Sequence, residues 1–220
     1  MRTDLDRPAA IAAVARDLYR NASPAPRALQ SLRPFICPFE ALLPWVPERG
    51  RMLDIGCGAG LFLGLVAQAR PQITAIGFDA SRGAIAAAQQ MALEHFGDER
   101  IDFRYSAVEE AWPARPFDAV SIVDVLHHIP VDGQRTVVEQ ALAHVAPGGV
   151  LIYKDMADRP LLKAGWNRLH DLVMARQWIR YRPIEEVRAW VEQAGGTVIH
   201  RAARSMGPYA HELLVVRQAT

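Results

Sequence analysis

Residues 53–60 read LDIGCGAG and combine an acidic side chain with three alternating glycines. Asp54 stands two residues before Gly56, and Gly58 and Gly60 follow at intervals of two. Glycine permits a tight turn and lets a ligand come close to the backbone. A carboxylate beside that turn repels phosphate and favours a ligand with positive charge, such as an ammonium or a sulfonium group.

A second acid, Asp79, ends the apolar segment ITAIGFD, 19 residues after Gly60. An acid at this place can accept hydrogen bonds from both hydroxyls of a ribose. The alternative is that Asp79 caps a helix over residues 81–97. The glycine spacing is G-x-G-x-G and not the G-x-G-x-x-G of dinucleotide-binding proteins, which argues against a pyrophosphate ligand.

Polar residues also follow the two later apolar segments. Asp124, His127 and His128 follow FDAVSIV and are candidate catalytic residues. Either histidine is a candidate general base, although one of such a pair often serves packing, and Asp124 is a candidate for lining the pocket of a bound ligand. Lys154 and Asp155 end the segment VLIYKD. Two charges at the end of a central strand must be solvated or paired, so they indicate either substrate binding or a salt bridge.

Residues 159–182 carry six Lys and Arg residues with aromatic side chains between them. Trp166 and Tyr181 are candidate substrate contacts here, and His170 is a further candidate base. One interpretation is an amphipathic lid helix with a solvated basic face. The others are a substrate wall for an anionic or carrier-bound acceptor, and a docking surface for a partner subunit or a second copy of the chain.

Short apolar runs alternate with helical patterns between residues 51 and 155. The expected strands are residues 51–55, 73–79, 101–106, 117–126 and 150–155, and the expected helices are residues 60–70, 81–97 and 132–149. This alternation with short links predicts a doubly wound parallel sheet with helices on both faces. The winding then follows from the right-handed crossover rule.

The two ends of the chain depart from that alternation. Residues 1–47 show no strand pattern and predict an N-terminal helical cap of two helices around SPAP. Residues 184–196 predict another helix, and TVIHRAARS and HELLVVRQ predict an antiparallel hairpin that turns at Gly207-Pro208. We therefore expect effectively one domain, with the cap at 1–47, the sheet domain at 48–220 and a helical lid insertion at 156–182.

Composition excludes several broad classes. The formal net charge is +1, so no global field attracts nucleic acid or membranes. No stretch approaches the roughly 18 apolar residues of a membrane-spanning helix, and the first residues do not resemble a signal peptide. The two cysteines, Cys37 and Cys57, form neither a disulfide framework nor a zinc pattern. We expect a cytoplasmic protein without a metal, without nucleic acid as a partner and without integral membrane association.

Four landmarks together resemble the class I S-adenosylmethionine-dependent methyltransferases. They are the D-x-G-x-G-x-G segment, Asp79 in GFDAS, the segment FDAVSIVDVLHHIP and the segment LAHVAPGGVLI, in that order over about residues 50–155. The resemblance implies a seven-stranded, mainly parallel sheet in which the last strand inserts between the fifth and the sixth. It also implies S-adenosylmethionine as the cofactor and S-adenosylhomocysteine as its product.

The resemblance assigns cofactor-binding residues one by one. They are Asp54, Gly56, Cys57, Gly58, Gly60, Asp79, Ala80, Ser106, Ala107, Val123 and Asp124. There is one departure, because many relatives carry an acid after the third strand that bonds the adenine amino group, and Ser106 stands there in this chain. The Ser106 hydroxyl or the Ala107 backbone N–H can still contact adenine.

The implied activity is methylation of a small-molecule acceptor at oxygen or carbon, in a metabolite or in a biosynthetic intermediate of the polyketide or aryl-polyene type. The N-P-P-Tyr/Phe signature of amide and exocyclic-amine methylation is missing, because VDVL stands in its place. Two alternatives remain. One is a non-catalytic S-adenosylmethionine-binding partner subunit, and the other is a nicotinamide-dependent oxidoreductase, which the glycine spacing and Asp54 oppose.

Overall fold

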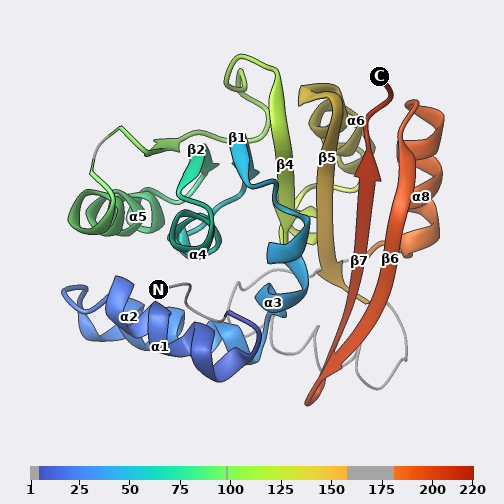
Figure 1. The fold of residues 1–220 in the computed structure, drawn as a ribbon. Coiled ribbons are helices and arrows are strands. Elements are labelled where there is room, and N and C mark those ends of the chain that lie inside the picture. The colour runs from blue at the N-terminus through green and yellow to red at the C-terminus, as the bar shows by residue number, and fades with distance from the viewer. Residues whose placement is uncertain (1–4, 98, 158–180) are drawn as a thin grey trace. The chain divides into compact units, whose positions relative to one another are not determined.

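The computed structural model describes residues 5–97, 99–157 and 181–220 (Figure 1). Residues 158–180, which include most of the predicted lid with Trp166 and His170, lie outside the described residues. The chain forms two compact units, Met1–Asp118 and Ala119–Thr220, and strand β4 (Phe117–Val123) begins in the first and continues in the second. The domain boundaries expected from the sequence remain predictions.

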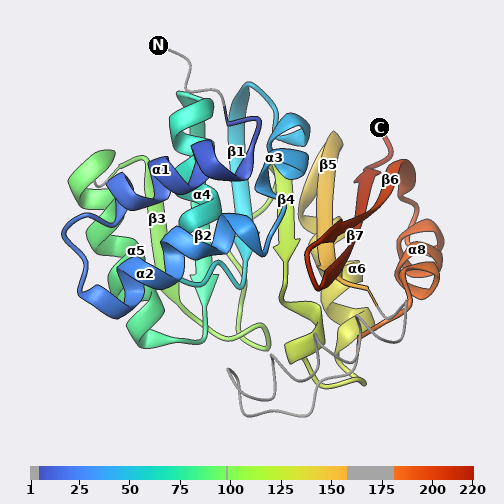
Figure 2. The ribbon, with the colours of Figure 1, turned by 90° about the horizontal axis from the view of Figure 1, so that it is seen from below.

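Met1–Asp118 contains the N-terminal helices and three parallel strands. Its elements are α1 (Pro8–Leu18), α2 (Pro24–Leu32), η1 (Arg33–Phe35), α3 (Phe39–Leu42), η2 (Leu43–Trp45), β1 (Arg49–Ile55), α4 (Leu61–Ala69), β2 (Gln72–Asp79), α5 (Arg82–His95) and β3 (Ile101–Tyr105). Helix α4 packs on β2, and α5 packs on β2 and β3. Figure 2 shows α1 running across α4, which it contacts.

Ala119–Thr220 contains the rest of β4 and the antiparallel strands. Its further elements are η3 (Leu126–His128), α6 (Gln134–His144), β5 (Val145–Met156), α8 (Ile184–Gln193), β6 (Thr197–Met206) and β7 (Tyr209–Arg217). Helices α6 and α8 pack against each other, α6 packs on β5, and α8 packs on β6 and β7.

The strand order is β3-β2-β1-β4-β5-β7-β6 in one seven-stranded sheet. Strand β1 pairs in parallel with β2, and β2 with β3, whereas β7 pairs antiparallel with both β5 and β6. The predicted mainly parallel sheet with a C-terminal antiparallel hairpin and N-terminal helices is confirmed. The inserted position of β7 buries its residues from Leu213 to Val216 almost completely.

Local sequence explains where several elements begin and end. Helix α2 begins with Pro24, so the SPAP segment opens the second helix and does not merely separate two helices. Ser81 caps α5 by accepting a hydrogen bond from the Ala84 N–H, and the left-handed Gly97 follows the helix end.

Several predicted boundaries were wrong by a few residues. Helix α6 ends at His144 and not at residue 149, because β5 already begins at Val145 and includes the Pro-Gly-Gly segment. Strand β1 begins at Arg49, two residues before the apolar run, since its first residues pair with β2 from Gln72 onward. Strand β4 ends at Val123, because the next residue has a positive φ.

Candidate functional site

The loop after β1 has a backbone that only glycine adopts easily. Gly56, Gly58 and Gly60 have φ values of 66°, 55° and 84°, in the left-handed region that side chains disfavour. At Gly60 the packing adds a second reason, because a Cβ there would lie 2.5 Å from Cζ of Phe103. At Gly58 the nearest atom to such a Cβ is Nη1 of Arg33, at 3.9 Å. The loop is therefore tightly packed at Gly60 and open at Gly58, where a ligand can approach the backbone.

Asp79 at the end of β2 is held in one orientation by two backbone donors. Its Oδ2 accepts a hydrogen bond from the Gly58 N–H at 2.9 Å, and its Oδ1 accepts one from the Ser81 N–H at 2.8 Å. Each carboxylate oxygen has a second lone pair, so the fixed carboxylate still has capacity to accept from a diol. Asp79 thus connects the glycine loop to the start of α5 and keeps its ability to bind a ligand. Ala80, beside it, is exposed.

Asp54 and Cys57 are both buried in the first unit, and the Asp54 charge acts on the Cys57 thiol. Asp54 is 3% exposed and Cys57 8%. Burial raises the pKa of the Cys57 thiol well above its usual range, and the negative charges of Asp54 and then Asp79 raise it further. The thiol therefore stays protonated at neutral pH, which argues against Cys57 as a nucleophile.

The end of β3 lies beside Asp79. The Ser106 N–H donates to the Asp79 carbonyl oxygen at 3.1 Å, and Ser106 and Ala107 are both half-buried. Hydrogen bonds thus join Gly58, Asp79 and Ser106, which are three of the residues that the sequence predicted for the cofactor. They come from the ends of three neighbouring parallel strands, where α/β sheets bind their ligands.

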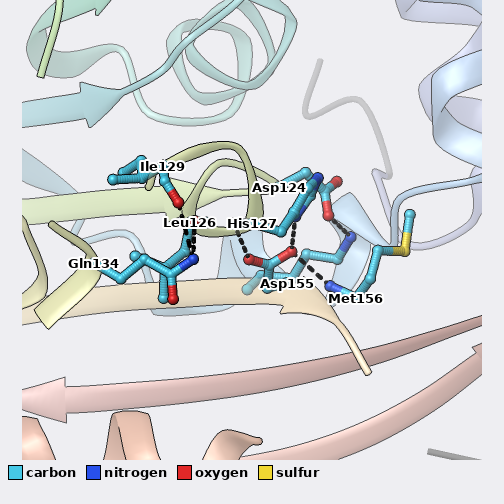
Figure 3. Close-up of polar contacts among 8 residues, drawn as sticks. Asp124, Leu126, His127, Ile129, Gln134, Asp155 and Met156 are labelled. Atoms are coloured by element: carbon cyan, nitrogen blue, oxygen red, sulfur yellow. Dashed lines mark hydrogen bonds and ion pairs between the residues drawn. The ribbon is translucent and has the colours of Figure 1, made fainter. Parts of the chain in front are cut away.

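The ends of β4 and β5 are joined by a partly buried ion pair. Lys154 Nζ donates to Asp124 Oδ1 at 2.5 Å, and the Asp124 N–H donates to the Lys154 carbonyl oxygen at 2.9 Å (Figure 3). Lys154 is fully buried, and Asp124 has a φ of 58°, which is unusual for a residue with a side chain. The salt-bridge alternative for Lys154 is therefore present, and its role in substrate binding stays a prediction. Val123, predicted to line the cofactor site, is buried at the end of β4.

Asp155 pairs with His127 on the neighbouring loop. Its Oδ1 contacts Nδ1 of His127 and accepts from the Met156 N–H at 2.7 Å, while its Oδ2 accepts from the His127 N–H at 3.3 Å (Figure 3). Burial raises the pKa of the Tyr153 hydroxyl well above its usual range, and the charge of Asp155 and a hydrogen bond with it add to the rise. Tyr153, His127 and Asp155 form a buried polar group in which the tyrosine stays protonated.

Three rings meet around His127. The His128 ring centroid lies 4.2 Å away, and the ring of Tyr181 meets His127 edge-on at 5.4 Å. His127 is buried, whereas His128 is exposed. The two adjacent histidines thus differ in environment, and Tyr181 lies against the buried one.

Gln134, the first residue of α6, holds the histidine loop in place. Its side-chain nitrogen donates to the carbonyl oxygens of Leu126 and Ile129, both at 3.0 Å (Figure 3). Its side-chain oxygen accepts from Nε of Arg182 at 2.6 Å. The turn of η3 is therefore fixed at both ends by one buried amide.

Among the described residues, no group of three or more His, Cys, Asp or Glu side chains is arranged to hold a metal ion. In the same part of the chain, no helix combines the length and the apolar character needed to span a bilayer.

Comparison with known proteins assigns the family. A family model described as "Methyltransferase domain" matches residues 27–201, which is well over half of the chain. The chain belongs to this methyltransferase-domain family. The resemblance found in the sequence motifs is thereby confirmed, and the strand order above is the class I, Rossmann-like order of such methyltransferases.

The methyltransferase domain is similar to curated and solved proteins. It is 29% identical over 161 residues to the ubiquinone biosynthesis O-methyltransferase of Xanthomonas campestris pv. campestris (strain B100). The aligned region covers 72% of this chain and 63% of that protein. The chain thus spans less than two thirds of the length of this curated relative.

Two solved structures share the fold of the methyltransferase domain. An O-methyltransferase family protein from Burkholderia thailandensis superposes with a TM-score of 0.70 at 24% identity, covering 93% of this chain and 60% of that one. The N-methyltransferase NodS from Bradyrhizobium japonicum WM9, solved with S-adenosyl-L-homocysteine, superposes with a TM-score of 0.66 at 20% identity. The superposition covers 94% of this chain and 99% of that one. At these identities the likeness shows the fold alone.

Sequence reasoning missed two residues, Tyr19 at the glycine loop and Gln134 at the histidine loop. The Tyr19 hydroxyl, buried at the end of α1, donates to the Ala59 carbonyl oxygen at 2.5 Å. Burial raises the pKa of Tyr19, and the nearby Arg33 guanidinium opposes that rise. The only signal for Tyr19 was its place on the apolar face with Ile11 and Leu18, which indicates burial and not a polar contact. Gln134 was missed because a single amide side chain belongs to no motif.

Proposed function

We propose that the protein transfers the methyl group of S-adenosylmethionine to an oxygen of a small-molecule acceptor and releases S-adenosylhomocysteine. The observation that carries the proposal is the fixed carboxylate of Asp79 beside a loop of three left-handed glycines. Membership of the methyltransferase-domain family supports the reaction class. The O-methyltransferase relative supports oxygen as the acceptor atom, whereas NodS is an N-methyltransferase with the same fold.

The residues of the first unit fit the proposed cofactor. Asp79 can accept from the two ribose hydroxyls through its second lone pairs. The Asp54 carboxylate suits the cationic methionine end. The space at Gly58 allows the ligand to reach the backbone, since no atom lies within 3.9 Å of the position of a Cβ there. When bound, S-adenosylmethionine supplies a methyl group on a sulfonium. Roles for Val123 and Asp124 toward it remain predictions.

In the second unit, we assign proton uptake from the acceptor hydroxyl to His127. Oδ1 of Asp155 contacts Nδ1 of His127, and Oδ2 of Asp155 accepts a hydrogen bond from the backbone N–H of His127. The two contacts fix both the imidazole ring and its loop. A proton on Nδ1 leaves Nε2 as the basic atom, and Asp155 stabilises the imidazolium that forms. The raised pKa of Tyr153 keeps its hydroxyl protonated as a donor to Asp155. His128 is the competing base, because it is exposed.

Two features bear on the setting of the protein. Cys37 and Cys57 are both buried thiols outside any disulfide, which supports a reducing compartment such as the cytoplasm. The contact from Tyr19 to Ala59 supports the interpretation of the N-terminal helices as a cap on the glycine loop. The carrier-bound acceptor and the partner surface assigned to residues 156–182 remain proposals from the sequence.

Calorimetric titration tests the cofactor assignment. We expect micromolar binding of S-adenosylmethionine and S-adenosylhomocysteine, no binding of NAD, and loss of binding in Asp79→Ala. The matched control is Asp102→Ala, because Asp102 is an exposed acid on β3 whose partner is Arg104. Binding of NAD in place of the sulfur nucleosides would overturn the proposal and favour an oxidoreductase. Binding of S-adenosylhomocysteine without turnover on any hydroxylated acceptor would favour the non-catalytic partner subunit.

A further inference from the structure

The turn after β3 brings a second acid to Ser106. The Ser106 hydroxyl donates to Glu110 Oε2 at 3.2 Å, and the Glu110 N–H donates to the Ala107 carbonyl oxygen at 3.1 Å. The hydroxyl also lies 3.4 Å from the Ala107 carbonyl oxygen. A hydroxyl has one proton, and the shorter distance and the negative charge favour Glu110 as its acceptor.

This turn is held beside Asp79. The Ser106 N–H donates to the Asp79 carbonyl oxygen, and the ring centroids of Phe78 and Trp112 lie 5.5 Å apart. The Trp112 side chain also donates to the Val108 carbonyl oxygen at 2.9 Å. The turn therefore lies next to Asp79, within reach of the base of a nucleoside whose ribose meets Asp79.

The polar groups of the turn complement one edge of adenine. Because the Ser106 proton points to Glu110, the oxygen keeps lone pairs for an incoming N–H donor, and the carboxylate strengthens that acceptor. The next residue offers the opposite group, since the Ala107 N–H has no hydrogen-bond partner among the described residues. An acceptor beside a donor matches the amino group and the neighbouring ring nitrogen of adenine.

We propose that the Ser106 oxygen accepts a hydrogen bond from the adenine amino group and that Glu110 orients Ser106 for this contact. Glu110 thereby makes the cofactor site select adenine over hypoxanthine. This inference rests on the proposed function. Hypoxanthine carries a carbonyl oxygen in place of the amino group, so it would set an acceptor against the Ser106 oxygen. Glu110 is then a positioning residue for the base, and Ser106 makes the contact.

Binding of two nucleosides tests the proposal. Calorimetry measures the dissociation constants of S-adenosylhomocysteine and of its deaminated analogue S-inosylhomocysteine, and thermal melting checks the fold of each variant. We expect the wild type to prefer the adenine compound by about tenfold or more, because the analogue loses the hydrogen bond to the Ser106 oxygen and sets a second acceptor against it. Glu110→Ala should reduce that preference to about twofold. The matched control, Glu109→Ala, removes an exposed neighbouring acid and should keep the full preference.

A rescue separates recognition from structure. Ser106→Asp in the Glu110→Ala background places a carboxylate directly at the acceptor position and should restore the preference. A preference that Glu110→Ala leaves unchanged overturns the inference and leaves the proposed function intact. An equal loss of affinity for both nucleosides also overturns it, because Glu110 would then only support the turn. A wild type that binds neither nucleoside overturns both proposals.

Discussion

The two units stabilise their strand ends in different ways. At the ends of β1 and β2, backbone N–H groups of Gly58 and Ser81 donate to one carboxylate, Asp79. At the ends of β4 and β5, charged side chains pair with each other, as Lys154 does with Asp124. The first arrangement leaves Asp79 able to accept further hydrogen bonds from a ligand. In the second, each charged side chain neutralises the other. Substitution of Asp79 should therefore affect ligand binding, whereas breaking the pair of Lys154 and Asp124 should affect stability.

The largest effect should follow from unbalancing the buried pair. Lys154→Met leaves the Asp124 carboxylate without its ammonium partner, and we expect unfolding in urea to show a loss of about 3–5 kcal/mol. Asp124→Asn in the same chain should recover much of it. The control is Arg104→Met, which breaks the exposed pair with Asp102 and should cost about 1 kcal/mol or less. Equal losses for both single variants would remove the contrast between the two units.

The histidine loop should show the next largest effect, on catalysis. His127→Gln should lower kcat on a hydroxylated acceptor by about a hundredfold, because a general base contributes that order of rate. The affinity for S-adenosylhomocysteine should stay unchanged. His128→Gln is the matched control and should keep most of the activity. A larger loss in His128→Gln would assign the base to the exposed histidine instead.

The glycine loop should show a smaller effect, on stability. Gly60→Ala forces a side chain into a φ of 84° and against the Phe103 ring, so we expect a loss of about 1–3 kcal/mol in urea unfolding. Gly83→Ala is the control, because that glycine lies in α5 with nothing within 4 Å of its Cβ position. The free energy of unfolding of Gly83→Ala should rise by about 0.4–1 kcal/mol. A neutral Gly60→Ala would show that the loop relaxes easily.

The smallest effect concerns the reactivity of Cys57. Burial and the charges of Asp54 and Asp79 raise its pKa, so the thiolate fraction at pH 8 is lower than for an ordinary cysteine. We expect iodoacetamide to modify Cys57 slowly in the folded protein and rapidly in urea, as read by mass spectrometry of the peptide that carries it. Fast modification of the folded protein would mean that the carboxylates do not act on the thiol.

Much of the fold was predictable because its signals are local. Strand β4 is buried at nearly every position and reads as a central strand, and Gly207 and Pro208 mark the turn between β6 and β7. Boundaries were less predictable, since they depend on pairing partners. Arg49 belongs to β1 because Gln72 lies opposite, and α6 ends at His144 because β5 begins at Val145.

The candidate site was predictable to the same degree. Asp79 was found from its place after a strand, and its bonds to Gly58 and Ser81 agree with a binding role that titration has yet to test. Lys154 and Asp155 were found as charges that require partners, but the sequence left the choice between substrate and salt bridge open. Their partners lie 30 and 28 residues earlier in the chain, so no spacing rule selects them.

The sequence by itself determined the family, the parallel sheet and the glycine loop, because strand periodicity and the demand for positive φ are properties of neighbouring residues. Only the tertiary structure decided which side chains meet. It pairs Lys154 with Asp124, His127 with Asp155 and Ser106 with Glu110, and it brings Tyr19 to the glycine loop. Except for Ser106 with Glu110, these contacts join elements far apart in the chain, and register and packing determine their distances.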